Sequence, residues 1–100
     1  MDFSDQENLQ EIIKEIQMFK VYSTNIVALG YDESRKILRV IFKGNSSYLY
    51  FNVEPEVWEN LKNSESKGRT LSESIIKQKD KYKYIKIWMI KEFLSNEKYE

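Results

Sequence analysis

The spacing of apolar residues changes at Val21, and this change constrains the fold of the chain more than any other feature. Before it, apolar residues recur at helical intervals and form one stripe, made of Leu9, Ile12, Ile13, Ile16 and Phe19. Ser4–Glu7 (SDQE) precedes the stripe as a capping box, in which serine and glutamate each bond the other's backbone amide. We therefore expect an amphipathic helix of about four turns within residues 1–20.

After Val21 the sequence is rich in β-branched and aromatic residues and is divided by turn residues. The segments read TNIVALGYD, KILRVIFK and SSYLYFNV, at residues 24–32, 36–43 and 46–53. Asp32–Lys36 makes the first connection, and Gly44-Asn45 makes the second as a tight hairpin. The sequence predicts three antiparallel strands in meander order.

Helical signals return after the strands. Proline at position 55 suits the first turn of a short helix whose inner face is Val57, Trp58 and Leu61. Thr70–Glu73 (TLSE) is a second capping box, before a helix that carries Ile75 and Ile76. Residues 82–87 fit a strand, but residues 85–94 also fit a helix, which we favour.

The predicted fold is α+β: a three-stranded antiparallel meander sheet packed with an N-terminal amphipathic helix and two to three C-terminal helices. One hundred residues suit one undivided core. Residues 1–20 form an added helix, residues 21–87 form the domain, and residues 88–100 form a helical extension.

Composition argues against an enzyme. The chain has no histidine and no cysteine, which removes the commonest general base and all thiolate chemistry. Neither metal-ligand spacing nor a serine-nucleophile elbow is present. We expect no catalytic residue, no metal and no cofactor. No apolar run approaches a membrane span, and the acidic start differs from a signal peptide, so we expect no membrane and a cytoplasmic protein.

Two tyrosines, Tyr48 and Tyr50, lie two positions apart in the third predicted strand and so share one face of it. If the purely apolar rows of the strands meet the helices, the tyrosines fall on a mixed face with Arg39 and Lys43. Aromatic rings beside cations on an open sheet are typical of single-stranded nucleic-acid binding. Three interpretations stay open: terminal segments cover this face, it binds a protein or a second copy, or it binds nucleic acid.

Charge is uneven along a chain whose net charge is zero. Residues 1–20 carry a net charge of −3, and residues 66–91 carry +6. The basic segment includes Lys67, Arg69, Lys77 and Lys81. A local positive field favours an anionic partner, although lysines also decorate the solvent face of ordinary helices.

Ser66–Gly68 (SKG) has two interpretations. It resembles a fragment of a phosphate loop, without the spacing of a nucleotide-triphosphate site. In that case Lys67 and Arg69 offer donors to a phosphate before the next helix. The alternative, which we favour, is a helix C-cap with Gly68 in a left-handed conformation.

Several of these stretches, in this order, resemble the KTSC domain, a small module found alone in bacterial and phage proteins and appended to some lysyl-tRNA synthetases. The matching motifs are Ser23–Ile26 (STNI), Gly30–Asp32 (GYD), Tyr48–Tyr50 (YLY) and Ser66–Gly68 (SKG). The chain departs from the pattern at Val53–Pro55, where one additional residue precedes proline, and in the hairpin loop. The resemblance covers about residues 21–87 and implies a small antiparallel sheet with helices.

The family's activity is unknown, and the resemblance implies RNA binding only by association. The residues that could carry it here are Tyr48, Tyr50, Ser66, Lys67 and Gly68. Our hypothesis is a non-enzymatic module that binds RNA or another nucleic acid, as a monomer or homodimer. The candidate contacts are Tyr48, Tyr50, Arg39, Lys43, Lys67, Arg69, Lys77 and Lys81. The alternative is a protein-interaction factor, for example a small phage-encoded inhibitor of a host nuclease or defence complex.

Overall fold

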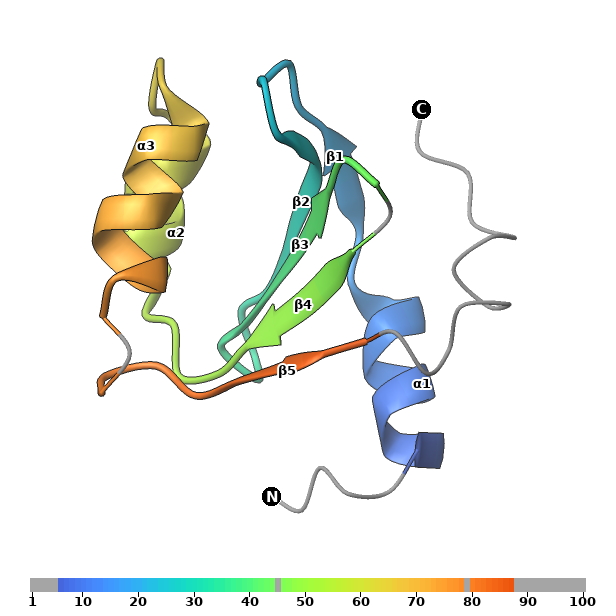
Figure 1. Cartoon of the computed structure of the whole chain (residues 1–100). Coiled ribbons are helices and arrows are strands. Elements are labelled where there is room, and N and C mark those ends of the chain that lie inside the picture. The colour runs from blue at the N-terminus through green and yellow to red at the C-terminus, as the bar shows by residue number, and fades with distance from the viewer. Residues whose placement is uncertain (1–5, 45, 79, 88–100) are drawn as a thin grey trace.

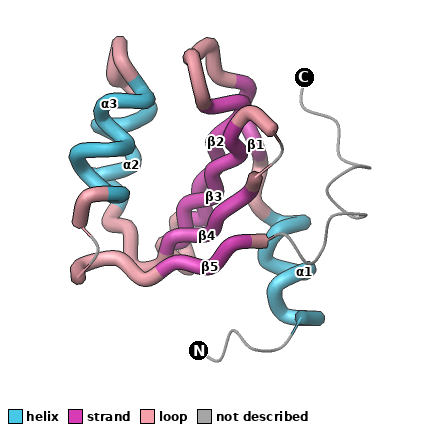
Figure 2. The backbone as a smooth tube through the Cα atoms, in the orientation of Figure 1, coloured by secondary structure: helices cyan, strands magenta, loops and turns pink. Residues whose placement is uncertain are grey.

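The structure, a computed structural model, describes residues 6–44, 46–78 and 80–87. An antiparallel sheet lies between helix α1 on one face and the helices α2 and α3 on the other, as Figures 1 and 2 show. The five described strands pair in chain order, β1-β2-β3-β4-β5. Their bounds are β1 Met18–Lys20, β2 Ile26–Asp32, β3 Ile37–Phe42, β4 Ser47–Tyr50 and β5 Tyr84–Lys86. The helical elements are α1 Gln6–Glu15, α2 Pro55–Lys62, α3 Lys67–Leu71 and a π-helical segment η1 Ser72–Ile76.

The α+β class is confirmed, but the prediction of three strands is wrong because β1 and β5 extend the sheet at its two edges. Helix α1 ends at Glu15, so Phe19 lies in a strand and not on the helical stripe. Ile85 and Lys86 lie in β5, where we had favoured the start of a helix. Strand β1 has three residues, too few for a period of two to be read from the sequence, and at β5 a helical pattern over residues 85–94 competes with the alternation. Ile87, the next residue of that predicted helix, is not helical either: its amide donates to the Ser47 carbonyl at 2.7 Å. Residues 88–94, and Ser4 of the first capping box, lie outside the described residues.

Both faces of the sheet are buried, and this corrects the predicted face of the tyrosines. Tyr48 pairs with Val40 and Tyr50 pairs with Leu38, so the tyrosines share a face with the apolar row of β3. That face packs on the α2–α3 side and forms the first core cluster. The opposite face carries Leu49 and packs against α1 as the second core cluster. The predicted face holds only for a sheet with one buried face, and this sheet has helices on both sides.

Helix α2 begins at Pro55 as predicted, with Glu54 as its N-cap and Leu61 buried. The second capping box is wrong: α3 begins at Lys67, and the Thr70 hydroxyl lies 2.6 Å from that of Ser64. Gly68 is therefore inside the first turn of α3 and is not a left-handed C-cap.

Helix α3 continues directly into η1. The amide of Lys77 donates to the Ser72 carbonyl at 2.9 Å, five residues back, which is the bond of a π-turn. Ile75, from this wider turn, is buried in the first core cluster, and Ile76 is partly exposed beside it. This segment therefore covers the face of the sheet that carries Tyr48 and Tyr50.

Candidate functional site

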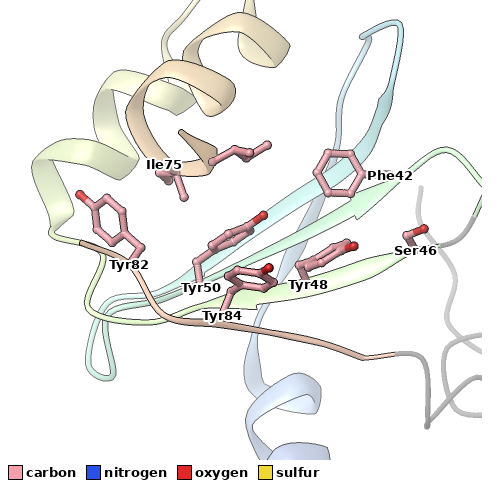
Figure 3. A pocket seen from close by; sticks show the side chains of 8 residues that line it. Phe42, Ser46, Tyr48, Tyr50, Ile75, Tyr82 and Tyr84 are labelled. Carbon is pink, nitrogen blue, oxygen red and sulfur yellow. The ribbon is translucent and has the colours of Figure 1, made fainter. Parts of the chain in front are cut away.

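A hollow of about 350 Å³ opens between the sheet and the π-helical segment η1. We call it the tyrosine pocket. It is lined by Phe42, Ser46, Tyr48, Tyr50, Ile75, Ile76, Tyr82 and Tyr84 (Figure 3). Most of its wall is aromatic, and the two isoleucines close it on the helical side.

Three adjacent strands place the rings of the pocket. Tyr50 pairs with Tyr84 across β4 and β5, so Tyr48, Tyr50 and Tyr84 stand on one face. Their ring centroids are 5.7–6.2 Å apart, and Figure 3 shows the three rings side by side over the sheet. Phe42, from β3, meets Tyr48 edge to face at 5.6 Å. These spacings are typical of attractive aromatic contacts, which hold the rings in place.

The three tyrosines differ in exposure. Tyr50 is only 6% exposed, and its burial, followed by the nearby Tyr48 and Tyr84, raises the pKa of its phenol to about 12. Tyr84 is 53% exposed, and Tyr48 is intermediate. Tyr50 is therefore a floor of the pocket, whereas Tyr48 and Tyr84 offer ring surface to a ligand.

Two lysines, Lys81 and Lys86, lie against rings of the tyrosine pocket. The ammonium of Lys86 lies 6.0 Å from the Tyr48 ring centroid, and that of Lys81 lies 5.4 Å from the Tyr82 ring centroid. Lys43 follows the Phe42 wall, and Lys77 follows η1; both are exposed. Of the predicted contacts, Tyr48 and Tyr50 line the pocket and Lys81 lies beside its Tyr82 wall, whereas Lys43 and Lys77 only adjoin pocket residues in the sequence.

Arg39 does not belong to this site. It pairs with Leu49 on the α1 side of the sheet and is 0% exposed. Its Nε donates to the Ser47 hydroxyl at 3.3 Å. The sequence prediction placed Arg39 beside the tyrosines because it assumed the wrong pairing of strand faces.

Lys67 and Arg69 lie in a second hollow of about 370 Å³, which we call the polar pocket. Its walls are residues 22–25, which follow β1, and residues 65–69, at the start of α3. The ammonium of Lys67 donates to the Ser64 carbonyl at 2.8 Å. These two predicted contacts therefore line a different pocket from the tyrosines.

Phe42, Tyr82 and Tyr84 line the pocket but are not among the contacts predicted from the sequence. The signal was present in YKYIK at residues 82–86, where alternate aromatic and apolar positions fit a strand. The competing helical pattern over residues 85–94 obscured it. Ile75 and Ile76 could not be found, since a π-turn leaves no periodic signature.

The described residues contain no group of three or more acidic side chains that could hold a metal ion. Among the same residues, no helix has the length and apolarity to cross a bilayer.

Comparison with known proteins identifies relatives. The sequence model of the KTSC domain matches residues 22–84. A protein from Tsukamurella paurometabola is 46% identical over 52 residues, which cover 52% of this chain and 78% of the relative. The crystal structure of a KTSC domain protein from Yersinia pestis aligns with a TM-score of 0.65 at 30% identity, over 72% of this chain and 97% of that one.

Proposed function

The chain belongs to the KTSC domain family, and we propose that it is a non-enzymatic module that binds single-stranded nucleic acid, RNA foremost, through the tyrosine pocket. One observation carries the proposal: Tyr48 and Tyr84 offer exposed ring surface in a hollow bordered by lysines. A base can stack on such rings, while lysines neutralise the neighbouring phosphates.

The positive charge near the tyrosine pocket favours one class of ligand over another. A pocket of several aromatic rings also suits an organic cation, through cation–π attraction. However, the ammonium groups of Lys81 and Lys86 already lie 5.4 Å and 6.0 Å from the Tyr82 and Tyr48 ring centroids. Their positive charge repels a cationic ligand and attracts a flat ring that carries phosphate. The surroundings therefore favour a nucleotide unit over a quaternary ammonium group.

The test is fluorescence anisotropy with a labelled single-stranded RNA of random sequence, measured over a range of salt concentrations. We expect binding at low salt and a log–log salt slope of roughly −0.7 for each phosphate contacted. Tyr48→Ala and Tyr84→Ala should each weaken binding by about 1–3 kcal/mol if a base stacks on them. Absence of binding at low salt, or unchanged affinity in both variants, would refute the proposal.

Phe19→Ala is the matched control. Phe19 is an exposed ring, 49% accessible, but it lies in β1 at the other edge of the sheet from β5. Its removal takes away a similar amount of aromatic surface without touching the tyrosine pocket. Loss of RNA affinity in this variant would indicate non-specific attraction to aromatic surface.

A second candidate function, protein binding, is favoured by the surroundings of Phe19. It lines a separate hollow of about 500 Å³ with Trp58, whose ring stacks on Tyr31 at 5.5 Å. Exposed aromatic rings are common anchors of protein interfaces. A partner that is retained from lysate after nuclease treatment, and lost in Phe19→Ala, would support this candidate. A partner lost with nuclease treatment would support nucleic acid.

A further inference from the structure

The polar pocket joins two segments that are distant in sequence. Residues 23–25 follow β1 and residues 66–69 begin α3, and together with their neighbours Tyr22 and Glu65 they line one hollow. The two segments approach closely at Gly68, where a Cβ would lie 3.1 Å from Asn25 Oδ1 and 3.6 Å from Ser23 Oγ. Glycine thus lets the two segments meet side by side.

Hydrogen-bond donors dominate the walls of this pocket. The Arg69 guanidinium and the Asn25 side-chain amide make no donor bond within the part of the chain that the structure describes. Lys67 uses one ammonium proton on the Ser64 carbonyl and keeps two. Ser23, by contrast, is occupied: its hydroxyl oxygen accepts from the amides of Asn25 and Ile26. The free donors therefore come mainly from residues 25, 67 and 69.

The charge of the pocket is positive, because two cations face a single carboxylate, that of Glu65. A positive pocket rich in donors suits an oxyanion with several acceptor oxygens, and a guanidinium can bind phosphate through two parallel bonds. Tyr22, 91% exposed at the rim, adds an open ring. These features together fit a phosphate group that carries an aromatic base.

The polar pocket adjoins the tyrosine pocket along the sheet. The amide of Lys43 donates to the Asn25 carbonyl at 2.9 Å, and Ile26 pairs with Phe42. Asn25 is a wall of the polar pocket, and Phe42 is a wall of the tyrosine pocket. A nucleic-acid strand that leaves the tyrosine pocket past Phe42 would therefore run toward Asn25 in the polar pocket.

We propose that the polar pocket is a phosphate site, in which Arg69, Lys67 and Asn25 bind a phosphate group of the bound nucleic-acid strand. The site itself does not depend on the proposed function, but the strand as the source of the phosphate rests on it. The experiment therefore has two arms, one with inorganic phosphate alone and one with RNA.

In the first arm, inorganic phosphate is titrated into the full chain and followed by amide NMR. We expect saturable shifts confined to residues 22–25 and 66–69, lost in Arg69→Gln and kept in Tyr48→Ala. The phosphate site would be refuted by any of three results: no chemical-shift changes, changes that persist in Arg69→Gln, or changes that spread over lysines on other faces.

In the second arm, RNA binding is measured against salt. Arg69→Gln should weaken binding about tenfold and reduce the salt slope by about 0.7, as for one lost phosphate contact. Arg69→Lys should restore the slope but only part of the affinity, because it keeps the charge without the paired donors. Lys36→Gln is the control, since Lys36 lies in the β2–β3 turn and pairs with Glu54 at 3.3 Å.

The two arms separate the two proposals. Phosphate shifts without any RNA binding would refute the proposed function and leave the phosphate site, with another phosphate compound as its ligand. If Arg69→Gln leaves the RNA affinity unchanged, the phosphate that binds in the polar pocket does not belong to the bound nucleic-acid strand.

Discussion

The ring of Tyr48 stacks against that of Tyr50, with centroids 6.2 Å apart and planes inclined by 21°. The two residues alternate with Leu49 on β4 and so stand on one face, yet they differ in burial. Tyr50 belongs to the first core cluster, whereas Tyr48 only packs against it. The contact therefore joins a core residue to a surface that a ligand can reach.

Tyr50 should contribute much more than Tyr48 to the free energy of unfolding. Tyr50→Ala should lower the free energy of unfolding by about 3–5 kcal/mol, since it leaves a cavity in the core. Tyr48→Ala should cost about 1 kcal/mol, because this ring is already partly solvated. Urea unfolding followed by tryptophan fluorescence measures both. Equal losses in the two variants would contradict the difference in burial.

Alkaline pH should destabilise the protein through its buried phenols. Burial raises the pKa of Tyr50 to about 12, and burial followed by the nearby carboxylates of Glu33 and Glu54 raises the pKa of Tyr31 to about 12. An unfolded tyrosine ionises near pH 10, so between about pH 10 and 12 the unfolded chain has released protons that the folded chain keeps. Stability is therefore full below pH 10 and falls as the pH rises to 12.

The loss attributable to Tyr50 should reach about 2 kcal/mol at the upper end of this range. Urea midpoints measured at several pH values test it, with Tyr50→Phe as the reference because that variant has no phenol to ionise. The two proteins should differ in slope only above pH 10. Parallel slopes would show that Tyr50 titrates normally in the folded state.

The helices and strands with strong local sequence signals were predictable. Which side of each strand faces which helix was not. Pro55 and the apolar stripe of residues 9–16 each specify a helix by local chemistry, and both helices are present. The side on which Arg39 lies depends on the strand register and on α1 covering the second face, which are long-range properties. An arginine in a buried strand is rare, and its exposed placement was the ordinary expectation.

Arg39 should therefore matter for stability and not for nucleic-acid affinity. Arg39→Ala removes a large side chain that is 0% exposed and should cost about 3–5 kcal/mol through the cavity that it leaves. Arg39→Met keeps most of the volume and should cost less than Arg39→Ala, because it leaves a smaller cavity. Urea unfolding measures both variants. If Arg39→Met keeps its stability but loses RNA affinity, Arg39 contacts RNA, and the buried position beneath α1 is not the one that it takes in the complex.

Gly30 should be required for the edge strand β1, which is not among the predicted strands. It pairs with Met18, and a Cβ at this position would lie 2.5 Å from Met18 Sδ and 2.6 Å from the Gln17 carbonyl oxygen. The methionine can move aside but the backbone oxygen cannot, so Gly30→Ala should cost about 1–3 kcal/mol by overpacking. Part of that cost should appear as local opening of β1.

Amide hydrogen exchange measures that opening at Val21, whose N–H donates to the Val27 carbonyl at 2.9 Å beside β1. Gly30→Ala should speed exchange there far more than at the β3–β4 pairing. Gly44→Ala is the control: its Cβ meets no atom within 4 Å, and its φ of +91° imposes a strain confined to the hairpin. Normal protection of Val21 in Gly30→Ala would mean that the strand tolerates the side chain, and that glycine is not what allows β1 to approach β2.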